Sequence, residues 1–406
     1  MRILHTADWH IGKRLYQHQR TEEHQKFLDW LLNTIIDQHI DVLLISGDVF
    51  DTALPSSESM QLYYYFLHRL YTQTDTTAVI TAGNHDAAVR LEADRDFLKM
   101  GRIYVFGTLR SDLSQQIVYL PKDQPKIAIV ALPYLSENEI LSHQSLESTT
   151  NRHDRYRSAI RQIYRECVSL IPTDLGKILM GHLTVQGASN TGSERNILIG
   201  GLNSVRVDDF PSTVDYVALG HLHQSQSLSG QNYPIRYSGT PLPMTFRESK
   251  MDKKISLIEL NQNKKMPGEN WKEITIPTFR RLVTLEGEIN QILSLAASID
   301  QDWKDVYIEV KLLSSQPTVG MADQIRQAFA DQGGYVLTVE IMMENHKHHN
   351  FSASDIITQS PQDVFDQFYR EKHSVQATDL FNEVDDFKRM LSQLLEQIEN
   401  DKTELD

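Results

Sequence analysis

The stretch TAVITAGNHD, residues 77–86, places an apolar run directly before the polar residues Gly83 to Asp86. A short, β-branched run of this kind is typical of a buried strand, so the polar residues mark the strand's end. Four other segments share this design, because each is an apolar run that ends in residue types that bind metal ions. They are RILHTA before Asp8 and His10, DVLLIS before Gly47 and Asp48, KILM before Gly181 and His182, and DYVAL before Gly220, His221 and His223. This recurrence is the strongest signal in the sequence.

The first part of the chain alternates between strand-type and helix-type patterns. Residues 21–38 and 56–71 carry apolar side chains at helical spacing, and they separate the apolar runs at 2–7, 41–46 and 77–82. This alternation predicts an α/β fold in which right-handed crossovers join parallel strands. Open α/β sheets bind ligands at the carboxyl ends of their strands. We therefore expect the polar residues after the strands to converge.

The rest of the chain predicts two further parts. Short β-type runs and an amphipathic helix at 152–170 lead to a polar link at 261–270, so we expect a first domain over 1–275. Residues 276–345 restart as strand, helix, strand, helix and strand, which predicts a compact βαβαβ unit as a second domain. Residues 346–406 end in an acidic amphipathic stretch, which predicts C-terminal helices.

The composition narrows the class of protein. Cys167 is the single cysteine among 406 residues, so the chain can form neither an internal disulfide nor a cysteine-based zinc site, which fits a reducing compartment. Apolar stretches fall short of the ~20 residues that span a bilayer, and Asp8 and His10 stand where a signal peptide would be apolar. We therefore expect a cytoplasmic protein without membrane segments.

The net charge of -14 argues against a generic nucleic-acid binder, but bound cations can still create a local site for an anionic substrate.

The residues at the strand ends form a mixed set of nitrogen and oxygen ligands. This set suits Mn²⁺, Fe²⁺ or Mg²⁺, and Zn²⁺ is also compatible. It is too large for one catalytic ion with an open position, and it suits two ions about 3.5–4 Å apart that share a carboxylate. The predicted ligands are Asp8, His10, Asp48, Asn84, His182, His221 and His223.

Asp48 is the natural bridging ligand, since a lone Asp between the two halves of the set must serve both ions. Asp8, His10 and His223 would complete one site, and Asn84, His182 and His221 would complete the other. Such an ion pair lowers the pKa of a bound water and orients a phosphate.

His85 is not needed as a ligand, and it stands next to Asn84. We expect its imidazole to protonate the leaving oxygen or to stabilise charge on the phosphate. Asp51, in GDVFD, is a candidate to orient His85 or another imidazole of the site. A single histidine is more often structural than functional, but five polar strand ends by accident are improbable, because ionisable residues are seldom buried unpaired.

The motifs DxH, GD, GNHD, GH and GHxH, in this order, resemble the signature of calcineurin-like metallophosphoesterases. DWHIGKRL, ISGDVFDTALPS and TAGNHDAAVRL are similar, more specifically, to the nuclease subunits of bacterial SbcCD complexes, a double-strand-break repair nuclease family. The resemblance implies a β-sandwich flanked by helices with a capping domain. It also implies a manganese-dependent exonuclease and endonuclease that acts on DNA.

The same resemblance implies partners. They are an SbcC-type ABC ATPase with long coiled coils, a second copy of this chain bound through helices of the phosphoesterase domain, and a heterotetramer of both subunits. The amphipathic segment in 346–406 would dock on the base of the coiled coil, although packing on the chain's own core is an equal alternative.

Candidates for DNA contact are weaker. The arginines of the 152–170 helix, among them Arg157 and Arg161, are more typical of a solvated face than of a phosphate track. Lys13, Arg14 and Arg90 lie just beyond site motifs and are better candidates. The run HKHH at 346–349 lacks acidic or Cys partners at ligand spacing, so we interpret it as a linker.

Two other functions fit parts of the pattern. A phosphoesterase that acts on a small molecule or a protein would use the same core chemistry, but it would need neither a cap nor an acidic helical tail. A non-catalytic scaffold that keeps metals for stability would have no use for His85. DNA cleavage by a two-metal nuclease is therefore the favoured hypothesis.

Overall fold

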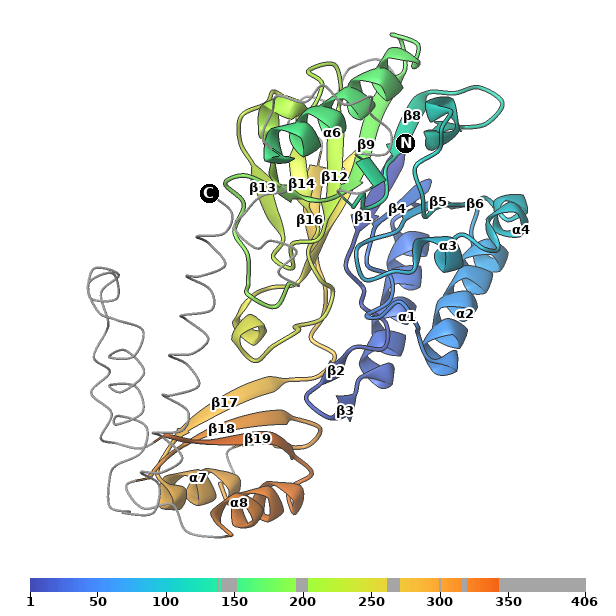
Figure 1. Ribbon diagram of the computed structural model, residues 1–406. Helices are drawn as coiled ribbons and strands as arrows, with labels where there is room; N and C mark the ends of the chain where they lie inside the picture. Colours follow the sequence, from blue (N-terminus) through green and yellow to red (C-terminus); the bar gives the residue numbers. More distant parts are fainter. Residues whose placement is uncertain are drawn as a thin grey trace, which may run out of the picture. The chain divides into compact units, whose positions relative to one another are not determined.

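The computed structural model describes residues 1–136, 139–140, 152–194, 204–260, 271–298, 301–314 and 320–342 (Figure 1). Met1–Met342 form one compact unit. The predicted link at 261–270 and the predicted helices of 346–406, with their run of histidines, lie outside the described residues. Among the described residues, no helix combines the length and the apolar character needed to cross a bilayer.

The first sheet has six strands, and β1 lies in its interior. In spatial order they are β16 (Trp271–Thr275), β15 (Lys254–Glu259), β1 (Arg2–Thr6), β4 (Val42–Ser46), β5 (Thr77–Thr81) and β6 (Ile103–Phe106). From β1 to β6 the strands are parallel, whereas β15 pairs antiparallel with β1 and with β16. The alternation predicted for the first part of the chain is therefore confirmed.

Two helices pack against this sheet, α1 (Thr21–Asp37) and α2 (Ser57–Gln73). Phe27 and Leu31 of α1 and Leu67 of α2 are buried in one apolar cluster with the strands. Ser56 caps α2, as the sequence allows, because its side chain accepts a hydrogen bond from the backbone N–H of Ser59.

The second sheet also has six strands. In spatial order they are β13 (Gln226–Leu228), β14 (Ile235–Tyr237), β12 (Tyr216–Gly220), β9 (Gly176–His182), β8 (Ile127–Ala131) and β7 (Ile117–Leu120). Its four central strands are parallel, and helix α6 (Arg152–Ser169) buries Ala159, Ile160 and Tyr164 in a cluster with strands of this sheet.

A third apolar cluster joins the two sheets face to face. It contains Ile3, Leu44 and Val79 of the first sheet and Ile129, Met180 and Ala218 of the second. The runs of β4 and β8 are buried at every residue, as expected for strands covered on both faces. The predicted α/β class, and the sandwich flanked by helices that the resemblance implies, are confirmed.

Short elements connect these layers. They are β2 (Arg14–Leu15), β3 (His18–Gln19), α3 (Ala88–Leu91), α4 (Arg95–Met100), β10 (Thr184–Val185), β11 (Ser204–Val205) and the 3-10 turns η1 (Leu113–Gln116), η2 (Val207–Asp209) and η3 (Arg247–Lys250).

The predicted βαβαβ unit is present. Its elements are β17 (Leu282–Gly287), α7 (Ile289–Ala296), β18 (Tyr307–Leu313), α8 (Met321–Ala330) and β19 (Tyr335–Met342). The three strands are parallel, in the order β17-β18-β19. Leu282 and Tyr307 of this unit share an apolar cluster with Leu15 and Phe246 of the first 275 residues.

Glycines let the two sheets approach at the carboxyl ends of their strands. A Cβ atom added at Gly220 would lie 1.8 Å from the carbonyl oxygen of Ser46 in β4, and one added at Gly83 would lie 2.1 Å from Asp48 Oδ1. The backbone oxygen and the Asp48 carboxylate are fixed by the surrounding structure, so they cannot move aside as the end of a flexible side chain can. The glycines that precede the polar residues are therefore a packing requirement.

We predict that Gly220→Ala lowers the free energy of unfolding by about 3 kcal/mol, the upper end for an overpacked core, because the new methyl group meets a backbone carbonyl. Gly320→Ala is the matched control. A Cβ atom at Gly320 meets nothing within 4 Å, but its φ of 95° carries a backbone cost of about 1–2 kcal/mol. Denaturant unfolding measures both variants, and equal losses would contradict the prediction.

Candidate metal centre

Side chains from both sheets meet at the carboxyl ends of the parallel strands. β1, β4 and β5 deliver Asp8, Asp48 and Asn84, while β9 ends in His182 and β12 is followed by His221. His182 Nε2 lies 3.4 Å from Asp48 Oδ2, and the backbone N–H of His221 donates to Asp8 Oδ1 over 2.8 Å. Strand ends far apart in the sequence therefore form one site, as the carboxyl-end rule predicts.

The amide of Asn84 lies between two imidazoles. Asn84 Oδ1 is 3.0 Å from His182 Nε2 and 3.1 Å from His221 Nδ1. His182 Nδ1 donates to the carbonyl oxygen of Ser46 over 2.9 Å, so Nε2 is the ring nitrogen that faces Asn84 and Asp48. The three residues predicted to hold one ion with Asp48 are thus in mutual contact.

His10 and His223 lie together near Asp48. Their ring centroids are 5.1 Å apart, and His10 Nε2 is 3.7 Å from Asp48 Oδ2. Asp8 Oδ1 lies 3.9 Å from His182 Nδ1. Ligand atoms of Asp8, Asp48 and His182 all lie within 4.8 Å of one another. Distances alone would therefore assign Asp8 to the same ion as His182. The division of the ligands between two ions stays a prediction.

Four of the predicted ligands have left-handed backbone conformations. The φ angles are 53° at Asp8, 47° at His10, 50° at Asp48 and 99° at His221. Such conformations are uncommon outside glycine, cost roughly 1–3 kcal/mol each and cluster at functional sites. Hydrogen bonds between neighbouring strand exits hold them, for example from the backbone N–H of His10 to Asp48 O over 3.0 Å.

The buried acids at the centre fit a cation. Among the described residues, Asp8 Oδ2 and His10 Nε2 are buried without a hydrogen-bond partner, which is costly unless a further ligand satisfies them. Burial raises the pKa of Asp8 to about 7. Burial also opposes ionisation of Asp48, but the charge and hydrogen bond of His182, together with the charges of His10 and His85, outweigh burial and lower the pKa of that carboxyl. Carboxylate and imidazole donors of this kind suit a divalent ion, so these residues fit one.

The pKa values of the His182 and His221 imidazoles are shifted in opposite directions. Burial lowers the pKa of His182, but the charge and hydrogen bond of Asp48, together with the charge of Asp8, outweigh burial and raise the pKa to about 9. Burial and the charge of His182 together lower the pKa of His221 to about 3. In the ion-free protein, His182 therefore carries a proton that an ion would displace.

His85 is held from two sides. Its backbone N–H donates to Asp48 Oδ1 over 2.8 Å, and its Nδ1 donates to the backbone carbonyl of Asp51 over 2.7 Å. Its Nε2 lies 4.0 Å from Asp48 Oδ2. The carboxylate of Asp51 lies 3.4 Å from His10 Nδ1 and 3.2 Å from Lys13 Nζ. Asp51 thus contacts the imidazole of His85 through its main chain and that of His10 through its side chain.

Three acidic residues that sequence reasoning passed over support the site. Asp86, the last residue of GNHD, accepts hydrogen bonds from the backbone N–H groups of Val49, Phe50 and Gly83. Glu194 accepts from the backbone N–H of His223. Glu248 reaches the same histidine through Ser193. Asp86 could have been found from its place in the motif, but Glu194 and Glu248 follow no strand end.

The basic candidates divide into two groups. Arg157 Nε pairs with Asp209 Oδ2 over 2.6 Å, and Arg161 lies 3.7 Å from the same carboxylate. These arginines therefore support a structural interpretation of the 152–170 helix, and Lys13 pairs with Asp51. Arg14 and Arg90 are exposed.

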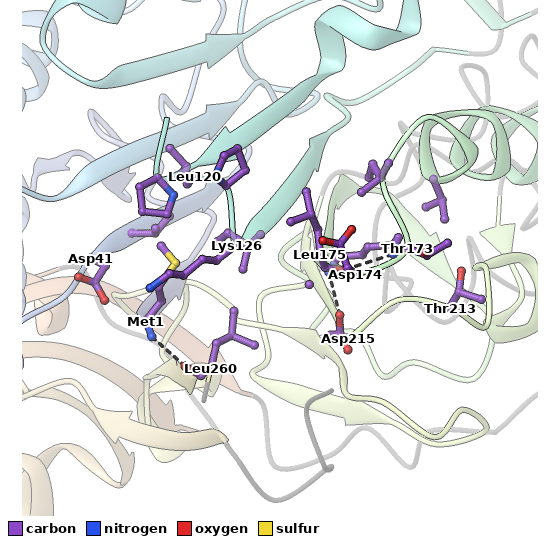
Figure 2. Close-up of a pocket in the computed structure, with 18 of the residues that line it drawn as sticks. Met1, Asp41, Leu120, Lys126, Thr173, Asp174, Leu175, Thr213, Asp215 and Leu260 are labelled. Atoms are coloured by element: carbon purple, nitrogen blue, oxygen red, sulfur yellow. Dashed lines mark hydrogen bonds between the residues drawn. The ribbon is translucent and has the colours of Figure 1, made fainter. Parts of the chain in front are cut away.

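A second hollow lies at the opposite end of the strands (Figure 2). Its lining includes Met1, Asp41 and Asp215, which directly precede β1, β4 and β12. None of the predicted metal ligands lines it. Acidic Asp41 and basic Lys126 both border it, so its charge favours no single class of ligand.

Comparisons with known proteins match both main parts of the chain. Residues 1–225 match the calcineurin-like phosphoesterase family, and residues 278–373 match the type 5 capsule protein repressor C-terminal domain. The chain is 33% identical to the D subunit of nuclease SbcCD from Escherichia coli K12 over 75% of each chain. It is 32% identical to the same subunit from Bacillus subtilis 168 over 92% of this chain and 93% of the relative. A solved structure, TT1561 of Thermus thermophilus, is similar with a TM-score of 0.40 and 11% identity, covering 68% of this chain and 99% of that chain.

We predict that Asp48→Asn weakens divalent-ion binding by more than the ~10–100-fold that loss of an outer partner costs, because the central carboxylate is lost. Titration calorimetry with Mn²⁺ measures the affinity. Asp112→Asn is the matched control, since Asp112 hydrogen-bonds Ser114 on the surface. Unchanged Mn²⁺ affinity in Asp48→Asn would contradict a role for Asp48 as a ligand.

Proposed function

Because the chain belongs to the calcineurin-like phosphoesterases and, within them, to the family of the D subunit of nuclease SbcCD, we propose that it cleaves DNA with two divalent ions held at its strand ends. It is a metal-dependent nuclease that acts with an SbcC-type ATPase in DNA end processing, replication and recombination. Its activities are double-strand exonuclease and single-strand or hairpin endonuclease.

The position of Asp48 carries this proposal. Its Oδ2 lies 3.4 Å from His182 Nε2, 3.7 Å from His10 Nε2 and 4.0 Å from His85 Nε2, so three strand exits surround one carboxylate oxygen. A bridging ligand in a two-ion site needs this central place. Asp8, His10 and His223 complete one site, and Asn84, His182 and His221 complete the other.

Two divalent ions held by these residues would supply an activated water and positive charge for the oxygens of the phosphodiester. His85 is the side chain proposed to take part in the chemical step. Since its Nδ1 donates to the Asp51 carbonyl, its Nε2 is the nitrogen on the side of Asp48. His85 acts there on the phosphate or the leaving oxygen. Asp51 is a positioning residue, because its carbonyl sets the ring of His85 and its carboxylate lies beside His10.

The ions are Mn²⁺ in this proposal. The mixed nitrogen and oxygen ligands support this choice but also accept Mg²⁺, Fe²⁺ and Zn²⁺. Family membership further supports cytoplasmic action on DNA, with residues 1–275 as the nuclease domain and 276–345 as the cap. Residues 346–406 bind the ATPase, and two copies of each subunit form a heterotetramer.

The dimer contact proposed for this chain uses an apolar surface on α2 and α4, defined by Tyr71, Phe97 and Met100. Phe97 and Met100 are 77% and 81% exposed, and Tyr71 is 47% exposed. Apolar side chains gathered on a surface in this way mark interaction sites. Tyr71 of α2 lies next to Gly101, the residue that follows Met100 at the end of α4.

We predict that His85→Ala keeps its bound ions but loses ~10²–10⁴-fold in the rate of DNA cleavage, because only the proton-transfer group is removed. The assay uses Mn²⁺ with linear and hairpin DNA, with and without the ATPase. Mn²⁺ stoichiometry is measured in parallel. Wild-type activity in His85→Ala would remove its catalytic role. Cleavage of a small phosphodiester but never of DNA would contradict the nuclease proposal.

We predict that the double variant Phe97→Glu, Met100→Glu is monomeric where the wild type is dimeric, since carboxylates in an apolar contact lose their hydration. Light scattering on the purified chain gives the mass. Leu170→Glu is the control, because Leu170 is also an exposed apolar residue, 50% exposed, but lies after α6. A dimeric double variant would place the contact elsewhere.

A further inference from the structure

Two polar side chains, half-buried Ser193 and buried Glu248, extend in a chain from His223. Ser193 Oγ is 2.5 Å from His223 Nδ1 and also contacts Glu248 Oε1 in a short hydrogen bond. Glu248 is fully buried. His223, Ser193 and Glu248 therefore form a continuous relay, which we name the His223 relay. It leads from the metal centre into the protein.

The hydrogen atoms of this relay can be assigned from the chemistry of its members. A carboxylate only accepts hydrogen bonds, and a serine hydroxyl has a single hydrogen to donate. Ser193 must give that hydrogen to Glu248, because two oxygen atoms in close contact without one would repel each other. Thr191 Oγ1 also lies 2.7 Å from Ser193 Oγ and 3.1 Å from Glu248 Oε1, but it does not supply the hydrogen between Ser193 and Glu248. Toward His223, Ser193 Oγ can then only accept. The Nδ1 of His223 therefore carries the ring hydrogen, and Nε2 has its lone pair available.

The other oxygen of Glu248 is fixed by two donors. Glu248 Oε2 accepts from Lys253 Nζ over 2.6 Å and from the backbone N–H of Met244 over 3.1 Å. Lys253 Nζ also donates to Thr240 Oγ1 over 2.8 Å. The buried ammonium of Lys253 compensates the charge of Glu248, which a buried ion needs. The carboxylate is thus held in one orientation, with Oε1 toward Ser193.

We propose that Glu248 is a positioning residue of the metal centre, which acts through Ser193 to fix His223 in the tautomer that presents Nε2 to a divalent ion. This inference rests on the proposed two-ion site, to which His223 belongs. Histidine ligands generally need such a partner on their second nitrogen, because it sets the tautomer and the ring orientation. Glu248 lies on η3, outside every strand exit, so none of the metal-ligand motifs contains it.

Glu248→Gln tests the assignment of hydrogen-bond donors and acceptors in the relay, because glutamine has almost the same shape as glutamate. The donors Lys253 and Met244 both face the Oε2 position, so the amide oxygen of the glutamine must take that place. Its NH₂ group then faces Ser193 and donates to it. The hydroxyl of Ser193 then turns toward His223 Nδ1, which at 2.5 Å is nearer than its other partner, Thr191 Oγ1, at 2.7 Å. His223 Nδ1 becomes the acceptor. The ring hydrogen of His223 moves to Nε2, where it blocks an ion.

The experiment uses the full chain, first freed of metal with a chelator and then titrated with Mn²⁺. In the metal-free state, ¹⁵N spectra of labelled histidine report the tautomer, and the spectrum of His223→Gln identifies the signal of His223 among the 16 histidines. We expect the wild type to show the Nδ1–H form and Glu248→Gln the Nε2–H form. We expect Glu248→Gln to bind one of two Mn²⁺ ions ~10–100-fold more weakly and to bind the other normally.

Three further variants separate positioning from folding. Ser193→Ala removes the relay without touching Glu248 and should weaken the same ion, whereas Ser193→Thr keeps a hydroxyl and should restore binding. Glu92→Gln is the matched control, because Glu92 is a partly buried carboxylate that accepts from Gly107 and Arg110 and lies outside the relay. It should bind both ions as the wild type does.

Two outcomes would overturn the inference. If Glu248→Gln and Ser193→Ala keep the Nδ1–H signal and wild-type affinity, the relay does not position His223, while the proposed nuclease site stands. If the wild type binds no divalent ion, the proposed function fails, and the inference fails with it. The spectra and the titration therefore distinguish the two failures.

Discussion

The metal centre depends on the close approach of two separate sheets at one end. The strands that carry the ligands are parallel within each sheet, but neither sheet alone supplies enough ligands for two ions. The carbonyl of Ser46 in β4 accepts from His182 Nδ1 in β9, and Gly220 of β12 leaves no room for a Cβ atom beside it. This contact holds the ligand-bearing ends of both sheets against each other. The apolar core between the sheets and the outer helices then fixes the distance over the whole length of the strands.

Burying so many ionisable groups together sets the electrostatics of the centre. Burial raises the pKa of Asp8. The pKa of His182 is raised in spite of burial, because the carboxylates of Asp48 and Asp8 lie beside it. Supporting residues restrict these groups further. Asp86 holds the backbone after β4, and Glu248 restrains the ring of His223. The backbone is left-handed at Asp8 and Asp48, two of the predicted ligands, and such strained conformations cluster at functional sites.

Much of this arrangement is readable from the sequence, because it rests on local patterns. The apolar run before GNHD, the helical spacing at 21–38 and the restart after Phe279 each correspond to an element of the structure. The carboxyl-end rule also places Asp8 beside His221. What local patterns cannot contain is the pairing between distant segments. Glu248 meets Ser193 across 55 residues of sequence, and Lys13, a candidate for phosphate contact, instead pairs with Asp51.

The place of β1 inside the first sheet has a consequence for how the protein is made. Its neighbours are β4 and β15, with Leu4 opposite Leu257. On the ribosome, Asp8 and His10 emerge first, but β15, the second neighbour of β1, follows about 250 residues later, after roughly 10–50 s at ordinary rates of synthesis. All the predicted ligands emerge during that interval, but β1 has only one of its two neighbouring strands. Stable assembly of the proposed metal centre therefore waits for β15.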